Sequence, residues 1–189
     1  AQLLERQKAT EKMLAEKSSK ILDTLKMATL TNNQEKQWLS FHKWKRYKQD
    51  PPTFYLELIA NESVHPILKT EMIEAFINMD VYTDVTIRKF DRTLTVPLQK
   101  LPKLKEHPTY QTIEKHLQKL QDSNVTLATY MAELFERYSK VYYPFFFPKK
   151  DTFTFLAALQ YVALQLYGEE AELDMERTEQ VNTYIKEIE

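Results

Sequence analysis

Hydrophobic positions recur at helical spacing along most of this chain, and the longest regular run lies in its second half. Intervals of three and four residues alternate from Tyr110 to Val141, which places one apolar stripe on a single helix face. Pro108 suits a first helical turn and Pro144 cannot continue a helix. The pattern therefore predicts one long central helix over about 109–143. The stripe consists of Tyr110, Ile113, Leu117, Leu120, Asn124, Leu127, Met131, Leu134, Tyr138 and Val141.

Asn124 is the one polar residue in that stripe, and it has two interpretations. A buried asparagine can fix the register of neighbouring helices, as it does in some coiled coils. Alternatively, Asp122, Ser123 and Asn124 supply the residues that cap a new helix, which would break the run at this point.

A second strongly apolar run covers residues 152–167. Asp151 is a suitable N-cap for it, and Gly168 fits the position that ends a helix. Because almost no polar face remains between these two residues, we expect a buried helix. At about 16 residues it is too short to span a bilayer comfortably.

Residues 1–30 also show helical spacing, but their stripe is diluted by polar residues. Leu14, Ile21, Leu25 and Ala28 share one face, whereas Glu11 and Ser18 interrupt it. Such a helix is expected to project from the fold or to form a coiled coil. It could then mediate homo-oligomer formation.

The segment 81–98 fits two structures. Its β-branched residues favour strands, so a small hairpin at 84–96 is one alternative. Thr83, Ile87, Phe90, Leu94 and Leu98 also fit a helical stripe. Because no Asn-Gly or Asp-Gly turn is present and an isolated hairpin is marginal in water, a helix is preferred.

Composition supports an all-α fold. The chain has 189 residues and a single glycine, which disfavours folds that rely on tight strand turns or phosphate-binding loops. No linker divides it, so a single-domain multi-helix bundle over 1–189 is expected. The absence of cysteine excludes disulfides and fits a cytoplasmic or membrane-peripheral protein, although an extracellular location is also compatible.

No catalytic, cofactor or metal motif is recognisable. A nucleophilic serine in a Gly-flanked turn is missing, and thiol chemistry is excluded. Glu62 and His65 have the Glu-x-x-His spacing of di-metal bundles, but no second copy accompanies them. We therefore expect no metal and no cofactor, and favour a non-enzyme over an enzyme with a dispersed site.

The main binding candidate is a basic and aromatic segment on a predicted helix. It consists of Lys43, Trp44, Lys45, Arg46, Tyr47 and Lys48. Interleaved cations and aromatic rings can hold a helix at an anionic membrane surface, or can neutralise phosphates and stack on bases. The alternative, which we favour, is that the rings face the core while the cations extend into water.

A second candidate is the aromatic cluster after the central helix. It consists of Tyr142, Tyr143, Phe145, Phe146, Phe147, Lys149 and Lys150. The cluster either closes one end of the core or contacts a partner through exposed rings.

Charge is balanced overall but uneven along the chain. The formal net charge is -1, with 26 basic and 27 acidic side chains, whereas residues 168–189 are strongly acidic. The sequence therefore predicts a non-enzymatic interaction or scaffold protein with a protein partner, and an anionic membrane surface is the second kind of partner that fits it. A nucleic-acid-binding regulator is the alternative, and the acidic end argues against it.

Overall fold

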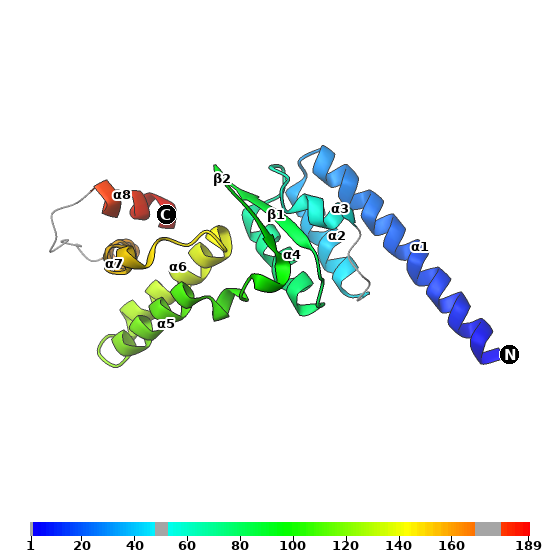
Figure 1. The fold of residues 1–189 in the computed structure, drawn as a ribbon. Coiled ribbons are helices and arrows are strands. Elements are labelled where there is room, and N and C mark those ends of the chain that lie inside the picture. Colours follow the sequence, from blue (N-terminus) through cyan, green and yellow to red (C-terminus); the bar gives the residue numbers. More distant parts are fainter. Residues whose placement is uncertain (1, 48–52, 169–178) are drawn as a thin grey trace. The chain divides into compact units, whose positions relative to one another are not determined.

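The computed structural model describes residues 2–47, 53–168 and 179–189. Within these ranges it contains eight α-helices and one two-stranded sheet, which confirms the predicted all-α, multi-helix class (Figure 1). The chain divides into two compact units, residues 1–101 and residues 102–189. That 1–189 folds as one domain stays a prediction.

In the first unit, four helices precede a β-hairpin. They are α1 (Gln2–Leu30), α2 (Gln34–Lys45), α3 (Thr53–Leu58) and α4 (Pro66–Asn78), followed by β1 (Asp84–Lys89), β2 (Arg92–Pro97) and the short 3-10 helix η1 (Leu98–Lys100). Helix α2 packs against α1 and α4, and α3 packs against β1. The core is rich in aromatic rings: Trp44 stacks on Tyr55 with 4.4 Å between ring centroids.

Two helices of this unit, α2 and α4, begin at capping residues. The Asn33 side chain accepts a hydrogen bond from the Lys36 amide at 3.0 Å and starts α2. His65 starts α4 in the same way: its Nδ1 accepts a hydrogen bond from the Ile67 amide at 3.2 Å. Pro66 occupies the first turn of that helix. The metal-type spacing of Glu62 and His65 therefore lies at a helix start, where the imidazole acts as a cap.

The preference for a helix at 81–98 is wrong, and the alternative hairpin is what forms. In β1, exposed and buried residues alternate along the strand, and Thr86 pairs with Thr95 across the sheet. Phe90, with φ of 55°, supplies the positive φ that the turn needs in place of glycine. The hairpin is stable because it is not isolated: the Arg88 amide donates to the Ile59 carbonyl, beside α3.

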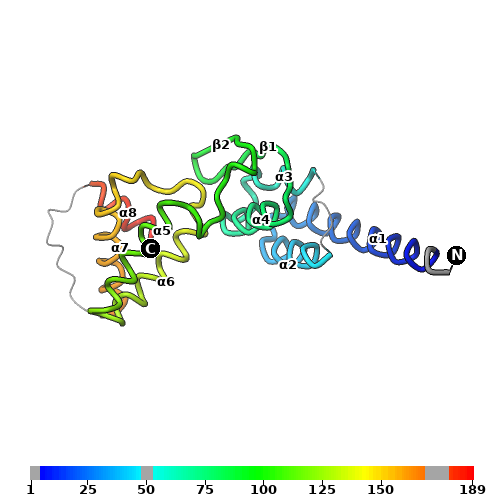
Figure 2. The backbone as a smooth tube through the Cα atoms, turned by 60° about the horizontal axis from the view of Figure 1, so that its bottom comes forward, coloured from blue at the N-terminus to red at the C-terminus, as the bar shows by residue number. Residues whose placement is uncertain are grey.

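The second unit contains four α-helices in its described part. They are α5 (Pro108–Gln121), α6 (Val125–Tyr142), α7 (Thr152–Tyr167) and α8 (Glu179–Ile188), with the short 3-10 helices η2 (Leu104–Glu106) and η3 (Lys149–Asp151). Helices α5 and α6 lie side by side, and α6 also packs against α7 and α8 (Figure 2). Asp151 fastens α8 to the start of α7, because its Oδ2 accepts hydrogen bonds from the Tyr184 hydroxyl and Gln180 Nε2, each at 3.0 Å.

The single long helix over 109–143 is also wrong, because the chain reverses between α5 and α6. The Asn124 side chain accepts a hydrogen bond from the Leu127 amide at 3.0 Å and caps α6. After the reversal the two halves of the stripe face each other, so that Tyr110 and Phe135 have ring centroids 5.1 Å apart. The structure thus adopts the capping alternative for residues 122–124.

Helix α7 has the predicted bounds, but its burial is one-sided. Phe155, Ala158, Leu159, Val162 and Ala163 are buried, whereas Phe153 is 73% exposed and Leu166 63%. Among the residues that the structure describes, no helix is both long enough and apolar enough to cross a membrane.

Candidate functional site

The basic segment of α2 separates its rings from its charges. Trp44 is buried in the aromatic core of the first unit, while Lys43 and Lys45 are exposed. Arg46 is exposed and Tyr47 half-buried, and Lys48 lies outside the described residues. Trp44 is therefore not available to stack on a base or to enter a lipid surface, whereas Lys43, Lys45 and Arg46 face solvent.

The aromatic cluster after α6 is likewise divided. Tyr143 and Phe147 are buried, and the Tyr143 hydroxyl donates to the Pro102 carbonyl at 2.6 Å. Tyr142, Phe145 and Phe146 are half-buried, while Lys149 and Lys150 are exposed. Phe147 stacks on Phe155 of α7 with centroids 4.2 Å apart. These contacts place the buried rings of the cluster in the core of the second unit.

The most unusual chemistry lies elsewhere, in two buried lysines of the first unit. Lys69 on α4 is 2% exposed and Lys89 at the end of β1 is 1% exposed. Lys69 Nζ donates to the Arg88 carbonyl, and Lys89 Nζ donates to Thr70 Oγ1 at 2.6 Å. Full burial of lysine is rare, because removing an ammonium group from water costs several kcal/mol.

Both lysines line one pocket of about 390 Å³. Arg88 and Glu62 form an ion pair at its rim, with 3.1 Å between Nη1 and Oε1. Val64, Pro66 and Phe90 supply the apolar part of the lining. The pocket thus combines three basic side chains with one carboxylate, in a volume suited to a small ligand.

Burial weakens the basicity of the groups around this pocket. It lowers the pKa of Lys69 to about 8, with the nearby Arg88 acting in the same direction and Glu62 opposing them. Burial and the charge of Lys69 lower the pKa of Lys89 well below its ordinary value. The pKa of His65 is lowered by burial and by Lys89, which suits the unprotonated Nδ1 that caps α4. Groups with such shifts often mark functional sites.

Sequence analysis missed these lysines, although a signal was present. In the hairpin, Lys89 shares the inward face of β1 with Val85 and Ile87. On α4, Lys69 lies one turn before Ile73 and two turns before Phe76, on the buried face of the helix. Each element thus carries a lysine at a position where its pattern predicts an apolar residue. If residues 81–98 had been predicted as a hairpin, these two lysines could have indicated a site.

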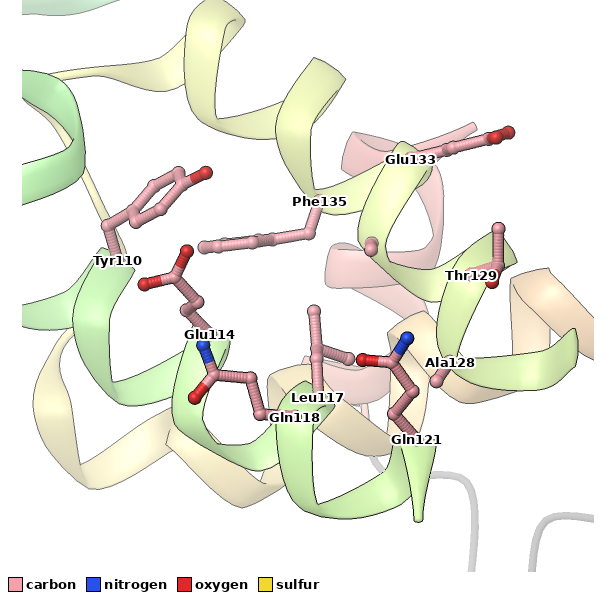
Figure 3. A pocket seen from close by; sticks show the side chains of 10 residues that line it. Tyr110, Glu114, Leu117, Gln118, Gln121, Ala128, Thr129, Glu133 and Phe135 are labelled. Atoms are coloured by element: carbon pink, nitrogen blue, oxygen red, sulfur yellow. The ribbon is translucent and has the colours of Figure 1, made fainter. Parts of the chain in front are cut away.

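A second cavity lies in the α5–α6 hairpin and offers weaker chemistry. It holds about 300 Å³, and Tyr110, Glu114, Leu117 and Phe135 point toward its centre (Figure 3). Its polar lining residues are exposed and can be satisfied by water; they are Glu114, Gln118, Gln121, Thr129 and Glu133. Nothing in this cavity requires a ligand to compensate a buried charge.

Comparisons with known proteins add no assignment: no protein family, no curated protein and no solved structure matches the chain.

Proposed function

We propose that residues 1–101 bind a small anion, a carboxylate or a phosphate, in the pocket formed by Lys69, Lys89 and Arg88. The observation that carries the proposal is the convergence of two buried lysines, from α4 and β1, on one pocket with a third cation at its rim. Burial and the charge of Lys69 both disfavour the protonated form of Lys89 and so lower its pKa. A bound anion would favour the protonated lysines and replace the solvation that burial removes.

The expected result is saturable binding of inorganic phosphate or succinate at pH 7, measured by isothermal titration calorimetry on the full chain. Affinity should fall as the pH rises through 8, because Lys69 then loses its charge. Lys69→Met should weaken binding at least about tenfold, the equivalent of one charge-assisted hydrogen bond.

Lys43→Met is the matched control, since Lys43 is an exposed lysine of the same unit. It should leave the affinity unchanged. Comparing phosphate with succinate separates the two sources of anionic chemistry. Absence of binding for both anions, or equal binding by the native chain and a folded Lys69→Met variant, would contradict the proposal.

A second candidate function is association of two copies of the chain through α1. This helix has 29 residues, yet among residues 5–30, whose side chains the structure describes, the buried ones lie in the final turns, at Leu25, Ala28 and Thr29. Residues 5–20 are exposed apart from the half-buried Leu14 and Ser18. A polar helix without tertiary support is marginal in water. A second α1 would extend the stripe of Leu14 and Ile21 into an intermolecular coiled coil.

Leu14→Asp combined with Ile21→Asp is expected to convert a dimer into a folded monomer in analytical ultracentrifugation, with cooperative urea unfolding retained. Ala9→Asp with Ser19→Asp adds the same charge at exposed positions of α1 outside the stripe and should leave the dimer intact. A native chain that sediments as a monomer, or loss of the cooperative transition in the first variant, would exclude this role for α1.

A further inference from the structure

The second unit carries an apolar groove between α5 and α7, which the buried Met131 of α6 also lines. The groove holds about 510 Å³. Leu120 of α5 and Phe153, Leu156 and Ala157 of α7 supply more of its apolar lining. Phe153 is 73% exposed, and the other three are half-buried. A hollow that exposes apolar side chains in a folded unit is typical of a contact site for a partner.

The edge of this groove on α5 is positively charged. His116 lines the groove, and its ring lies 5.9 Å from that of Phe153. Around the helix, the exposed Lys119 and Lys115 lie about 60° and about 100° from His116. Glu114, the one carboxylate of α5, lies about 160° from His116 and lines the other cavity (Figure 3). The lysines, and not the glutamate, therefore stand next to the groove.

The edge of the groove on α7 adds no negative charge. Helix α7 contains no charged residue, and the exposed Lys149 and Lys150 stand four and three residues before Phe153. Asp151 is next to them in sequence, but it is buried and its carboxylate already accepts hydrogen bonds from α8. The groove is thus apolar inside, with cations on α5 and just before α7.

We propose that this groove binds an acidic amphipathic helix of a partner protein. The apolar face of the partner would fill the hollow, and its flanking carboxylates would meet the lysines. Phe153 and Gln160 both line the groove and are seven residues apart on α7, or about 10 Å along its axis. Residues i and i+7 of a partner helix have the same separation. Lys115 and Lys119 are like charges four residues apart on one helix, a destabilising arrangement that a facing carboxylate relieves.

The shape of the groove favours a helix over a lipid surface. Side chains that project from a helix can reach the buried Met131, whereas a flat lipid surface would contact the projecting residues such as Phe153. The groove lies in residues 102–189, so this inference is independent of the anion pocket in residues 1–101.

The test is the fluorescence anisotropy of a labelled peptide titrated with the full chain at pH 7. The probe has about 16 residues, with leucines at i, i+3, i+4 and i+7 and glutamates beside them. One control peptide has lysine in place of each glutamate, and another has serine in place of each leucine. The acidic leucine peptide should bind saturably and at least about tenfold more tightly than either control. Because residues 102–189 contain 10 basic and 14 acidic side chains, non-specific attraction would favour the lysine peptide instead.

Phe153→Ala tests the apolar part of the groove. It should weaken binding of the acidic leucine peptide at least about tenfold, because the peptide loses a large apolar contact. Leu166→Ala is the matched control, since Leu166 is 63% exposed on the same helix but does not line the groove. It should bind the peptide as the native chain does. Far-UV circular dichroism verifies that both variants are folded.

Lys115→Gln combined with Lys119→Gln tests the charged edge. This variant should reduce the preference for the acidic over the lysine peptide at least about threefold. Lys43→Gln with Lys45→Gln changes the net charge equally at exposed positions of the first unit and should leave the preference unchanged.

Three results would overturn the proposal: no saturable binding of the acidic leucine peptide, equal affinity for the acidic and lysine peptides, or equal binding by the native chain and Phe153→Ala. Co-sedimentation with phosphatidylserine vesicles is measured in parallel. Vesicle binding that Phe153→Ala abolishes, without peptide binding, would assign the groove to an anionic membrane surface and likewise overturn the proposal.

Discussion

Replacing Phe155 by alanine is expected to lower the free energy of unfolding of residues 102–189 by about 3–5 kcal/mol. Phe155 is fully buried, stacks on Phe147 at 4.2 Å between centroids, and lies 4.7 Å from the ring of Tyr138. Rigid aromatic neighbours cannot collapse into the space that the ring leaves, so the variant loses both transfer free energy and packing contacts. Urea unfolding followed by far-UV circular dichroism measures the change.

Phe153→Ala is the matched control on the same helix. Phe153 is 73% exposed, so its replacement should change the free energy of unfolding by less than about 1 kcal/mol. The expected pattern is a large shift for the first variant and a small one for the second. Similar shifts in both variants would mean that the Phe155 ring is not the centre of the packed aromatic core.

The same variant also tests whether 1–189 is one cooperative domain. The chain has 2 tryptophans, Trp38 and Trp44, and both lie in the first unit. Tryptophan fluorescence therefore reports residues 1–101, whereas far-UV circular dichroism reports helices of both units. If the whole chain unfolds as one domain, Phe155→Ala moves both transitions together. Separate midpoints would show two folding units.

Helix content and most helix starts could be predicted from the sequence, because capping residues and hydrophobic spacing act locally. The central helix shows where that reasoning fails. A regular stripe on a straight helix and the same stripe folded at Asn124 have identical spacing. Only the contact between residues as distant as Tyr110 and Phe135 selects the reversal. The cap at residues 122–124 was visible, but its strength relative to a continuous helix depends on tertiary packing.

The hairpin illustrates a different limit. Residues 84–97 combine β-branched residues with helical spacing, and the absence of glycine removed the usual turn signal. A hairpin is marginally stable on its own, but one face of this hairpin is buried against helices. That burial decides between the hairpin and the helix. The positive φ of Phe90 is the cost of a turn without glycine.

Recognition of the candidate site depends on whether residues 84–97 form a hairpin or a helix. A lysine at 89 looks like an ordinary surface residue on a helix, and its burial follows only once β1 places it opposite α4. The pairing of Lys69 with the Arg88 carbonyl and of Lys89 with Thr70 joins residues 19 positions apart. Periodicity cannot reveal such a pairing, so the pocket could not be predicted from the sequence, although each lysine broke an apolar pattern.

The stability of the first unit is expected to rise by at least about 2 kcal/mol between pH 7 and pH 9.5, because folding lowers the pKa of both buried lysines. Lys69 has a pKa of about 8 in the folded chain and an ordinary value of 10.5. Between these values the unfolded chain binds a proton that the folded chain has released, so the free energy of unfolding increases with pH. Lys89, whose pKa burial and the charge of Lys69 also lower, acts in the same direction. Urea unfolding followed by tryptophan fluorescence measures the effect in the unit that contains both lysines.

The upper limit of the pH range follows from the buried tyrosine of the same unit. Burial raises the pKa of Tyr55, so above about pH 10 the unfolded chain loses tyrosine protons that the folded chain keeps, and stability falls. Lys69→Met removes one of the two lysine titrations and should therefore reduce the rise by about 2 kcal/mol and leave the contribution of Lys89, while Lys43→Met should retain the full rise. A native chain whose stability is flat or declines from pH 7 to pH 9.5 would mean that the two lysines are not desolvated. The pocket would then lack the buried charge that the anion site requires.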